Sequence, residues 1–286
     1  MSVQTSSAPG TRSVRLRRNA RPGFRWNDVV ASPLHDFPIR DEILFQCMPP
    51  TPRSDVLEVG PGAGFTAFRL ARRVRHITLV DVAPRAVEEL RRALGHVPNL
   101  EVVCADLTAP DLAVRLERRF DAAFGLDSFE YMKDPAACLR NLASVLRPGG
   151  ALFLTFPNTP PPAGDGVTWF TDLNVLETML EQAGFTSWRI EAVRPRRFAA
   201  ATYALLHEWP LRVFRRLRPG DRAARPQVYE ATWAFEHRRP LVKLKIALHL
   251  YWLVVDGVMR LGGKVFHVER VGDQPLGRQL VVRART

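Results

Sequence analysis

The stretch DVLEVGPGAG, Asp55 to Gly64, constrains the fold of this chain more than any other part of the sequence. It combines a short apolar run, typical of a buried strand, with a glycine turn and a helical pattern over Phe65 to Val74. Gly60 lets the strand end turn sharply, Gly62 lets backbone approach a ligand, and Gly64 lets the helix start close to the sheet. The stretch therefore predicts a strand, a turn and a helix that cradle a nucleotide.

The spacing of the glycines separates this turn from a dinucleotide fingerprint. A G-x-G-x-x-G pattern would place its third glycine at position 65, where this chain has Phe65. The turn instead has the spacing G-x-G-x-G after the acidic Glu58. NAD is therefore not the expected ligand, and a tight turn without any ligand is the alternative.

Strand-like and helix-like patterns alternate from Asp55 onward, which predicts a parallel sheet with right-handed crossovers. The expected strands are 55–59, 76–81, 100–106, 120–126, 151–156 and 187–193, and the expected helices are 38–48, 64–74, 84–94, 110–118, 135–146 and 172–183. A late apolar strand, Gln279 to Arg283, would pair antiparallel with strand 187–193. The predicted fold class is α/β: a Rossmann-like, doubly wound, mostly parallel seven-stranded sheet with an antiparallel last strand.

From about Leu57 to about Phe185, the order of these motifs resembles the class I S-adenosylmethionine-dependent methyltransferases. The first motif of that family, E/D-x-G-x-G-x-G, is matched by Glu58 and the three glycines. The stretch from Leu146 to Gly150, followed by ALFLTFPN, resembles the helix stop, tight turn and buried fifth strand of the family. The resemblance implies S-adenosylmethionine as the cofactor.

Acidic residues follow three of the predicted strands. Asp81 ends the second strand, 23 residues after Glu58, where its carboxylate would accept hydrogen bonds from ribose hydroxyls. A cap on the helix that begins near Pro84 is the alternative role. The resemblance implies that Asp106 accepts a hydrogen bond from the adenine amino group. The expected cofactor-binding residues are Glu58, Gly60, Pro61, Gly62, Gly64, Asp81, Val82, Asp106, Leu107 and Asp127.

The segment after strand 120–126, SFEYM, departs from the V-L-E-H-V pattern of small-molecule methyltransferases. Tyr131 stands where His is common, so a base role of that His is not carried over, and Glu130 is expected to be structural. The candidates for a general base are His35, His207 and His237, although a lone His is more often structural. A helix cap formed by Asp36 is the alternative explanation for the segment around His35.

A proline- and glycine-rich loop, from about 157 to 171, follows the strand 151–156. Loops that leave the carboxyl edge of a sheet often carry function, so Trp169 and Phe170 are candidates for the wall of an acceptor pocket. Packing against the next helix is the alternative for both residues.

The last two expected strands are separated by 84 residues, 194 to 277, which are predicted to be mostly helical. Trp233 and Trp252 in this insertion are further candidates for acceptor binding. The insertion is expected to be either a roof over the substrate or a homodimer interface built from Leu241 to Leu261. Its apolar stretch IALHLYWLVV is too short to span a bilayer.

The net charge of +12 is concentrated outside the central part of the chain. Residues 1–25 hold six arginines and no acid, and residues 194–225 hold nine arginines against Glu208 and Asp221. Such patches suit phosphates, anionic lipid head groups or acidic substrates, and a solvated arginine-rich surface is the alternative. The expected organisation is a disordered basic arm (1–22), a cofactor-binding core (23–193), a helical insertion (194–277) and the last strand of the core (278–286).

Other features limit the classes of chemistry. The chain has three cysteines without C-x-x-C spacing, which argues for a reducing compartment and against structural zinc, and no metal site is expected. The first 25 residues lack the apolar run of a signal or anchor, so a cytoplasmic location is expected, with peripheral contact at the inner membrane face as a refinement. The absence of a phosphate loop, H-E-x-x-H, G-x-S-x-G and the motifs of nucleic-acid base methyltransferases argues against those classes and against a nucleic-acid substrate.

The expected activity is transfer of the methyl group of S-adenosylmethionine to a small-molecule or lipid-like, isoprenoid acceptor, with S-adenosylhomocysteine as the second product. One alternative is an RNA methyltransferase that grips phosphates with its arginine-rich ends. The other is a cofactor-binding module without catalytic activity.

Overall fold

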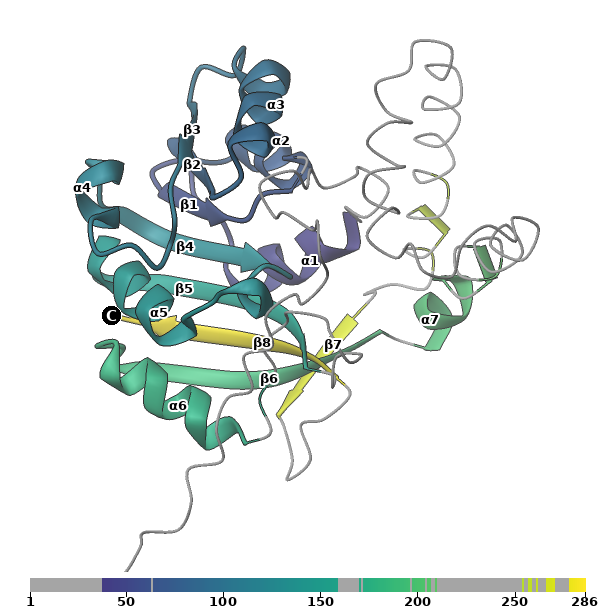
Figure 1. Cartoon of the computed structure of the whole chain (residues 1–286). Helices are drawn as coiled ribbons and strands as arrows, with labels where there is room; N and C mark the ends of the chain where they lie inside the picture. Colours follow the sequence, from purple (N-terminus) through teal and green to yellow (C-terminus); the bar gives the residue numbers. More distant parts are fainter. Residues whose placement is uncertain are drawn as a thin grey trace, which may run out of the picture.

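The computed structural model describes residues 38–62, 64–158, 170, 172–195, 197–203, 205–206, 209, 254, 257–258, 261, 266–270 and 278–286. Within these residues an eight-stranded sheet lies at the centre, with strand order β3-β2-β1-β4-β5-β8-β6-β7 (Figure 1). The strands are β1 (Asp55–Val59), β2 (His76–Asp81), β3 (Leu100–Cys104), β4 (Phe120–Leu126), β5 (Leu146–Asn158), β6 (Ser187–Pro195), β7 (Phe266–Arg270) and β8 (Arg278–Arg285).

The directions of the strands confirm the predicted fold class. β1 to β5 pair in parallel, and β8 pairs antiparallel with both β5 and β6. Since β6 is antiparallel to β8, it runs in the same direction as β1 to β5. The carboxyl ends of β1 to β6 therefore lie at one edge of the sheet, here called the carboxyl edge.

Two details of the sheet differ from the sequence-based expectation. β7 is an eighth strand, antiparallel to β6, and it lies in the insertion 194–277, which is predicted to be mostly helical. β5 begins at Leu146, which pairs with Phe120, so the stretch expected to be a tight turn is already strand. Gly149 adopts φ +74°, and the register shifts between Phe120 and Ala122, so the pairing with β4 is interrupted after Leu146 and resumes at Ala151.

The helices cover both faces of the sheet (Figure 1). Those whose buried residues pack on one face are α1 (Pro38–Cys47), α2 (Phe65–Ala71) and α3 (Pro84–Leu94). Those that pack on the other face are α4 (Leu112–Leu116), α5 (Pro135–Val145) and α6 (Leu173–Gln182). A short 3-10 helix, η2 (Phe129–Tyr131), follows β4, and α7 (Arg197–Tyr203) follows β6.

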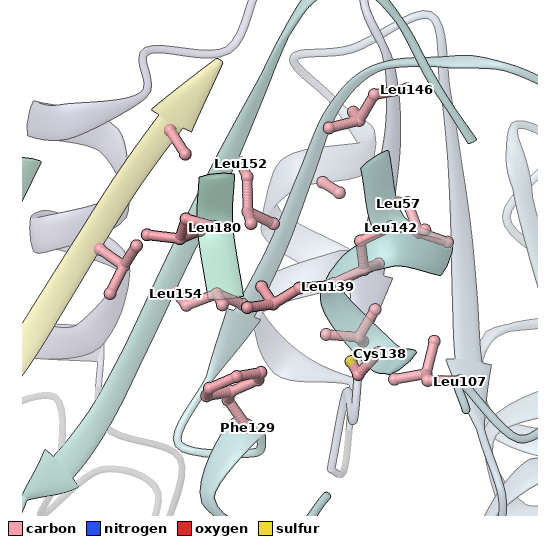
Figure 2. Packing of buried hydrophobic residues seen from close by; sticks show 14 of the residues in the cluster. Leu57, Leu107, Phe129, Cys138, Leu139, Leu142, Leu146, Leu152, Leu154 and Leu180 are labelled. Carbon is pink, nitrogen blue, oxygen red and sulfur yellow. The ribbon is translucent and has the colours of Figure 1, made fainter. Parts of the chain in front are cut away.

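Side chains of β1 alternate between the two cores, as the period of a strand requires. Val56 joins the cluster that contains Leu70 of α2, whereas Leu57 joins the cluster that contains Leu142 and Leu180. Figure 2 shows this second cluster, in which α5 supplies a row of leucines against the sheet. The two clusters together hold the central strands rigidly on both sides, as expected for a doubly wound fold.

An ionic cluster ties together the amino ends of the strands, at the edge opposite the carboxyl edge. Asp55 at the start of β1 is buried, and its carboxylate accepts from Arg75 Nε at 2.7 Å and from Arg147 Nη2 at 2.9 Å. Arg147 Nη1 also lies 2.9 Å from Oδ2 of Asp121, which accepts from the backbone N–H of Asp55. The hydrogen bond from Arg75, reinforced by Arg147, lowers the pKa of Asp55 to about 2.

Candidate functional site

The glycine turn after β1 has the backbone that the sequence predicts. Gly60, Gly62 and Gly64 have φ values of +61°, +58° and +78°, in the left-handed region that favours glycine. The N–H of Gly60 donates to the carbonyl of Val80 in β2 at 3.0 Å, and the N–H of Gly64 donates to the carbonyl of Pro61 at 2.9 Å. The turn therefore has a defined conformation at the carboxyl edge, between β1 and α2.

A serine from the segment after β4 holds the start of this turn. The buried Oγ of Ser128 donates to the carbonyl of Val59 at 3.0 Å. A Cβ added to Gly60 would lie 2.5 Å from the Cβ of Ser128, and one added to Gly125 would lie 2.8 Å from its Oγ. Both glycines are thus required by close approach, and Ser128 is a contributor to the site that the sequence analysis did not identify.

Gly64 has a different role from the one expected. A Cβ at this position would lie 2.6 Å from a methyl carbon of Leu94 and 2.9 Å from one of Leu90, both in α3. Gly64 therefore permits close packing of the turn against the neighbouring helix, rather than against the sheet as predicted. A side chain here would push α2 and α3 apart.

Asp81 lies at the carboxyl end of β2, where the ribose-binding acid was expected. Its Oδ1 accepts from the N–H of Ala83 at 2.8 Å. Burial raises the pKa of Asp81, against hydrogen bonds from the backbone amides of Ala83 and Val82. Ala83 is the residue before α3, so Asp81 stabilises the entry to the helix while it stands at the sheet edge. Val82, next to it, is 49% exposed and offers apolar surface there.

Asp106 and Leu107 follow β3 at the same edge. Oδ1 of the exposed Asp106 accepts from the backbone N–H of Thr108 at 2.8 Å and from its hydroxyl at 2.7 Å. Leu107 is buried, and its carbonyl accepts from Nδ2 of Asn141 at 2.9 Å. Local hydrogen bonds thus fix the loop in which the adenine-binding role of Asp106 is predicted.

Asp127 completes the row of acids, at the end of β4. It is a non-glycine residue in the left-handed region, with φ +52°. Its N–H donates to the carbonyl of Thr155 at 2.8 Å, and its Oδ1 accepts from the Thr155 hydroxyl at 3.1 Å. Strain of this kind collects at functional sites and persists where the surroundings fix the residue. Glu58 and Glu130 flank this region and are both buried.

The carboxyl edge therefore gathers the predicted cofactor-binding residues from four adjacent strands. The candidate bases and three of the four candidate aromatic residues lie outside the described residues: His35, His207, His237, Trp169, Trp233 and Trp252. Among the described residues, no group of histidine, cysteine and acidic side chains could hold a metal ion. Cys138 is buried in α5, and burial raises the pKa of its thiol well above the usual range, so it is not a nucleophile.

Phe170, the remaining aromatic candidate, packs in the core. Its ring is 1% exposed and stacks with Phe129 at a centroid distance of 6.3 Å, while Phe156 lies 5.7 Å away. This burial favours the packing alternative over a position in the wall of an acceptor pocket. Phe170 precedes α6 and is buried because it packs against the rings of Phe129 in η2 and Phe156 in β5.

Comparison with known proteins agrees with this geometry. Residues 56–150 match a family described as a methyltransferase domain. They form a class I S-adenosylmethionine-dependent methyltransferase domain. The matched range of this methyltransferase domain contains the glycine turn and the three acids, Asp81, Asp106 and Asp127.

Curated relatives extend the similarity somewhat beyond the methyltransferase domain. The chain is 33% identical over 142 residues to a ubiquinone biosynthesis O-methyltransferase of Alkalilimnicola ehrlichii, a match that covers 48% of this chain and 56% of the relative. A protein of the same name from Xanthomonas campestris is 32% identical over 162 residues, which are 55% of this chain and 66% of the relative. The chain therefore spans between about half and two thirds of the length of these relatives.

Solved structures support the fold assignment. Phosphoethanolamine N-methyltransferase 2 of Haemonchus contortus, in complex with S-adenosyl-L-methionine, aligns with a TM-score of 0.51 and 14% identity over 86% of this chain and 52% of that one. At this identity the likeness concerns the fold of the methyltransferase domain and not its substrate.

Proposed function

We propose that this chain transfers the methyl group of S-adenosylmethionine to a small, lipid-like acceptor of the isoprenoid type. The observation that carries the proposal is what the carboxyl edge brings together: the turn after β1, whose glycines Gly60, Gly62 and Gly64 are left-handed, and the acids Asp81 and Asp106 at the ends of β2 and β3. This arrangement fits an adenosine whose ribose hydroxyls donate to Asp81 and whose base lies near Val82 and Leu107.

The relatives support the acceptor class. Their names refer to O-methylation in the biosynthesis of ubiquinone, which is an isoprenoid quinone. We therefore propose that the acceptor of this chain is an apolar molecule and that the methyl group is transferred to one of its oxygen atoms. The apolar and aromatic composition of the insertion 194–277 is in keeping with such an acceptor.

The cofactor, when bound, supplies an electrophilic methyl group on a sulfonium. The task of the chain is to hold the acceptor oxygen in line behind that methyl group, and orientation alone can supply about 7–11 kcal/mol. The new bond uses a lone pair of the oxygen, while the electron pair of the broken bond stays on sulfur. A neutral hydroxyl must also lose its proton, for which His35, His207 and His237 remain the proposed bases.

The topology supports the insertion as the acceptor-binding part. β6 ends at Pro195 at the carboxyl edge, and Pro195 pairs with Phe266, the first residue of β7. The segment between Pro195 and Phe266 therefore leaves the sheet and returns to it at the carboxyl edge, where the glycine turn also lies. We propose that it forms a roof over the acceptor, with a homodimer interface as the alternative.

Trp233→Ala and Trp252→Ala test the roof. Each variant should keep the affinity for S-adenosylmethionine and reduce acceptor turnover, because cofactor contacts belong to the core. Calorimetry, turnover and sedimentation should be measured on the same preparations. Loss of cofactor binding, or dissociation of a dimer with unchanged turnover per subunit, would contradict the roof.

The activity itself is tested with methyl-labelled S-adenosylmethionine and separate lipid and RNA fractions of a cell extract. We expect a labelled product in the lipid fraction by mass spectrometry, together with S-adenosylhomocysteine. A labelled RNA product, formed at a rate that falls steeply with added salt, would support the RNA alternative. Cofactor binding without S-adenosylhomocysteine in any fraction would support a non-catalytic module.

A further inference from the structure

A buried hydroxyl in β5 makes two hydrogen bonds to Asp127, the residue that follows β4. Oγ1 of Thr155 donates to Oδ1 of Asp127 at 3.1 Å and accepts from the backbone N–H of Asp127 at 3.3 Å. The same N–H also donates to the carbonyl of Thr155 at 2.8 Å. Thr155 is 3% exposed, whereas Asp127 is partly exposed. Thr155 therefore holds both the backbone and the carboxylate of Asp127 from inside the sheet.

The two contacts of the Thr155 hydroxyl fix the direction of its single proton. Because the N–H of Asp127 donates to Oγ1, the hydroxyl proton is left for the carboxylate. An ionised carboxylate only accepts hydrogen bonds, and a bond to a charged acceptor is stronger than one between neutral groups. Asp127 has φ +52°, in a region that few residues other than glycine adopt, and its bonds to Thr155 hold it there.

Asp127 lies at the point where the sheet changes direction of winding. In the strand order, β2 and β3 lie on one side of β1, and β4 and β5 lie on the other (Figure 1). The crevice of such a sheet is outside the carboxyl ends of the two strands at this switch, β1 and β4. Ser128, the next residue, donates to Val59 and lies against Gly60 of the glycine turn. Asp127 is therefore one residue away from a contact with the turn, on the side of β4.

The two halves of S-adenosylmethionine differ in charge. The adenosine half is uncharged at neutral pH, and the amino-acid half carries an ammonium group on the far side of the sulfonium. The proposed function, on which this inference rests, places the ribose at Asp81, at the end of β2. The amino-acid half then extends across the glycine turn toward β4. Of the two cationic groups of the cofactor, only the ammonium has N–H donors for a carboxylate.

We propose that Thr155 is a positioning residue, which holds the carboxylate of Asp127 in place to bind the ammonium group of S-adenosylmethionine. Asp127 contacts the cofactor, and Thr155 acts only through Asp127. Since the hydroxyl fixes the carboxylate before the cofactor arrives, binding costs less side-chain freedom than it would with a mobile aspartate. The hydroxyl of Thr155 therefore contributes to cofactor affinity without touching the cofactor.

Binding of three ligands to the full chain tests this assignment by calorimetry. S-adenosylmethionine and S-adenosylhomocysteine both have the ammonium group, whereas methylthioadenosine lacks the amino-acid half. Thr155→Val keeps the shape of the side chain and removes the hydroxyl. It should weaken binding of the first two ligands roughly tenfold and leave the affinity for methylthioadenosine unchanged. Thr155→Ser keeps a hydroxyl and should bind all three ligands like wild type.

Thr78→Val is the matched control for the loss of a buried hydroxyl. Thr78 lies in β2 and is 1% exposed, and its hydroxyl has no hydrogen-bond partner among the described residues. The same chemical change at this position should leave the affinity for all three ligands unchanged. Urea unfolding of both variants should show folded proteins, so that a selective loss of affinity in Thr155→Val reports on the site and not on the fold.

A double-mutant cycle shows whether Thr155 acts through Asp127. Asp127→Asn keeps an acceptor for the hydroxyl but removes the charge, so it should also weaken both ligands that carry the ammonium group and spare methylthioadenosine. Adding Thr155→Val to Asp127→Asn should reduce the affinity for S-adenosylmethionine much less than Thr155→Val does alone. Fully additive effects would overturn the positioning role.

The pattern across the three ligands separates this inference from its alternatives. Normal affinity of Thr155→Val for S-adenosylmethionine, or an equal loss for all three ligands, would overturn the inference. A loss confined to S-adenosylmethionine would point to the sulfonium and would also overturn the assignment to the ammonium group. These measurements need no acceptor, so failure to find a methylated product would contradict only the proposed function.

Discussion

The hydroxyl of Ser128 donates to the carbonyl oxygen of Val59 at 3.0 Å, across 69 residues of sequence. This bond joins the segment after β4 to the last residue of β1, directly before the glycine turn. Because a Cβ on Gly60 would meet Ser128 at 2.5 Å, the two segments fit together only with glycine at that position. The shape of the glycine turn therefore depends on a residue of the segment that follows β4.

Gly60→Ala should abolish measurable cofactor binding, because it adds both left-handed strain and a clash with Ser128. Gly184→Ala is the control, since Gly184 also has positive φ but no atom near its missing Cβ. It should cost only the strain, about 1–2 kcal/mol of stability, and keep cofactor affinity. Calorimetry and denaturant unfolding of both variants measure these effects.

A second substitution tests the origin of the Gly60 effect. Ser128→Gly in the Gly60→Ala background removes the atom that clashes and should restore part of the cofactor affinity. Ser128→Ala keeps the Cβ and should restore none. Equal behaviour of the two double variants would show that the clash is not the cause.

Asp81→Asn should weaken binding of S-adenosylmethionine by about 1.5–3 kcal/mol, because hydrogen bonds to a charged acceptor are lost. Burial raises the pKa of Asp81, so its carboxylate becomes protonated at a higher pH than an ordinary aspartate does. As the pH is lowered, the affinity of the wild-type protein for S-adenosylmethionine should therefore begin to fall at a correspondingly higher pH. That part of the pH dependence should be absent in Asp81→Asn. Asp111→Asn, at an exposed ion pair with Arg115, is the control and should bind normally.

Asp55→Asn should lower the free energy of unfolding by about 2 kcal/mol and leave cofactor affinity unchanged. The pKa of Asp55 is lowered to about 2 in the folded state, so its contribution is complete above the unfolded pKa near 4. The contribution is lost as the pH falls from about 4 to about 2. Urea unfolding at neutral and acidic pH should show the two proteins converging in that window, and a constant difference would refute the assignment.

Phe170→Ala should destabilise the protein by about 3–5 kcal/mol, because it leaves a cavity between Phe129 and Phe156. Phe68→Ala, at a residue that is 37% exposed, should cost much less. Thermal unfolding of both variants provides the comparison. If Phe170→Ala has normal stability but impaired acceptor turnover, Phe170 belongs to the wall of the acceptor pocket and the packing role is contradicted.

Features encoded by local pattern could be predicted from the sequence. The apolar runs that end in glycine or aspartate predict β1 to β4, and Asp81 lies at the carboxyl end of β2 as its position in the sequence predicts. The sequence predicts that a glycine is needed at position 64 of the turn, but the side chains that it contacts, Leu90 and Leu94, lie about 30 residues away in sequence. Which surface a glycine approaches depends on the tertiary packing, and this has no local signal.

Long-range contacts explain the other differences. Ser128 looks like an ordinary residue after a strand, since its partner at Val59 is remote. β7 could not be predicted because its sequence, FHVER, is only weakly typical of a strand. The segment is a strand in the structure because it pairs with β6. The LRPGG sequence resembles a turn, yet pairing with Phe120 and the contact of Arg147 with Asp55 keep it in the sheet.

The place of β8 between β5 and β6 has a consequence for folding during synthesis. β1 to β5 are contiguous in sequence and can pair as they leave the ribosome, so the nucleotide-binding half can assemble early. β6 cannot join that half until β8 has been translated, after the whole insertion. Until then β5 presents an open edge, on which Leu280 and Val282 will later be buried completely. The nascent chain should therefore be most prone to aggregate through this edge while the insertion is being translated.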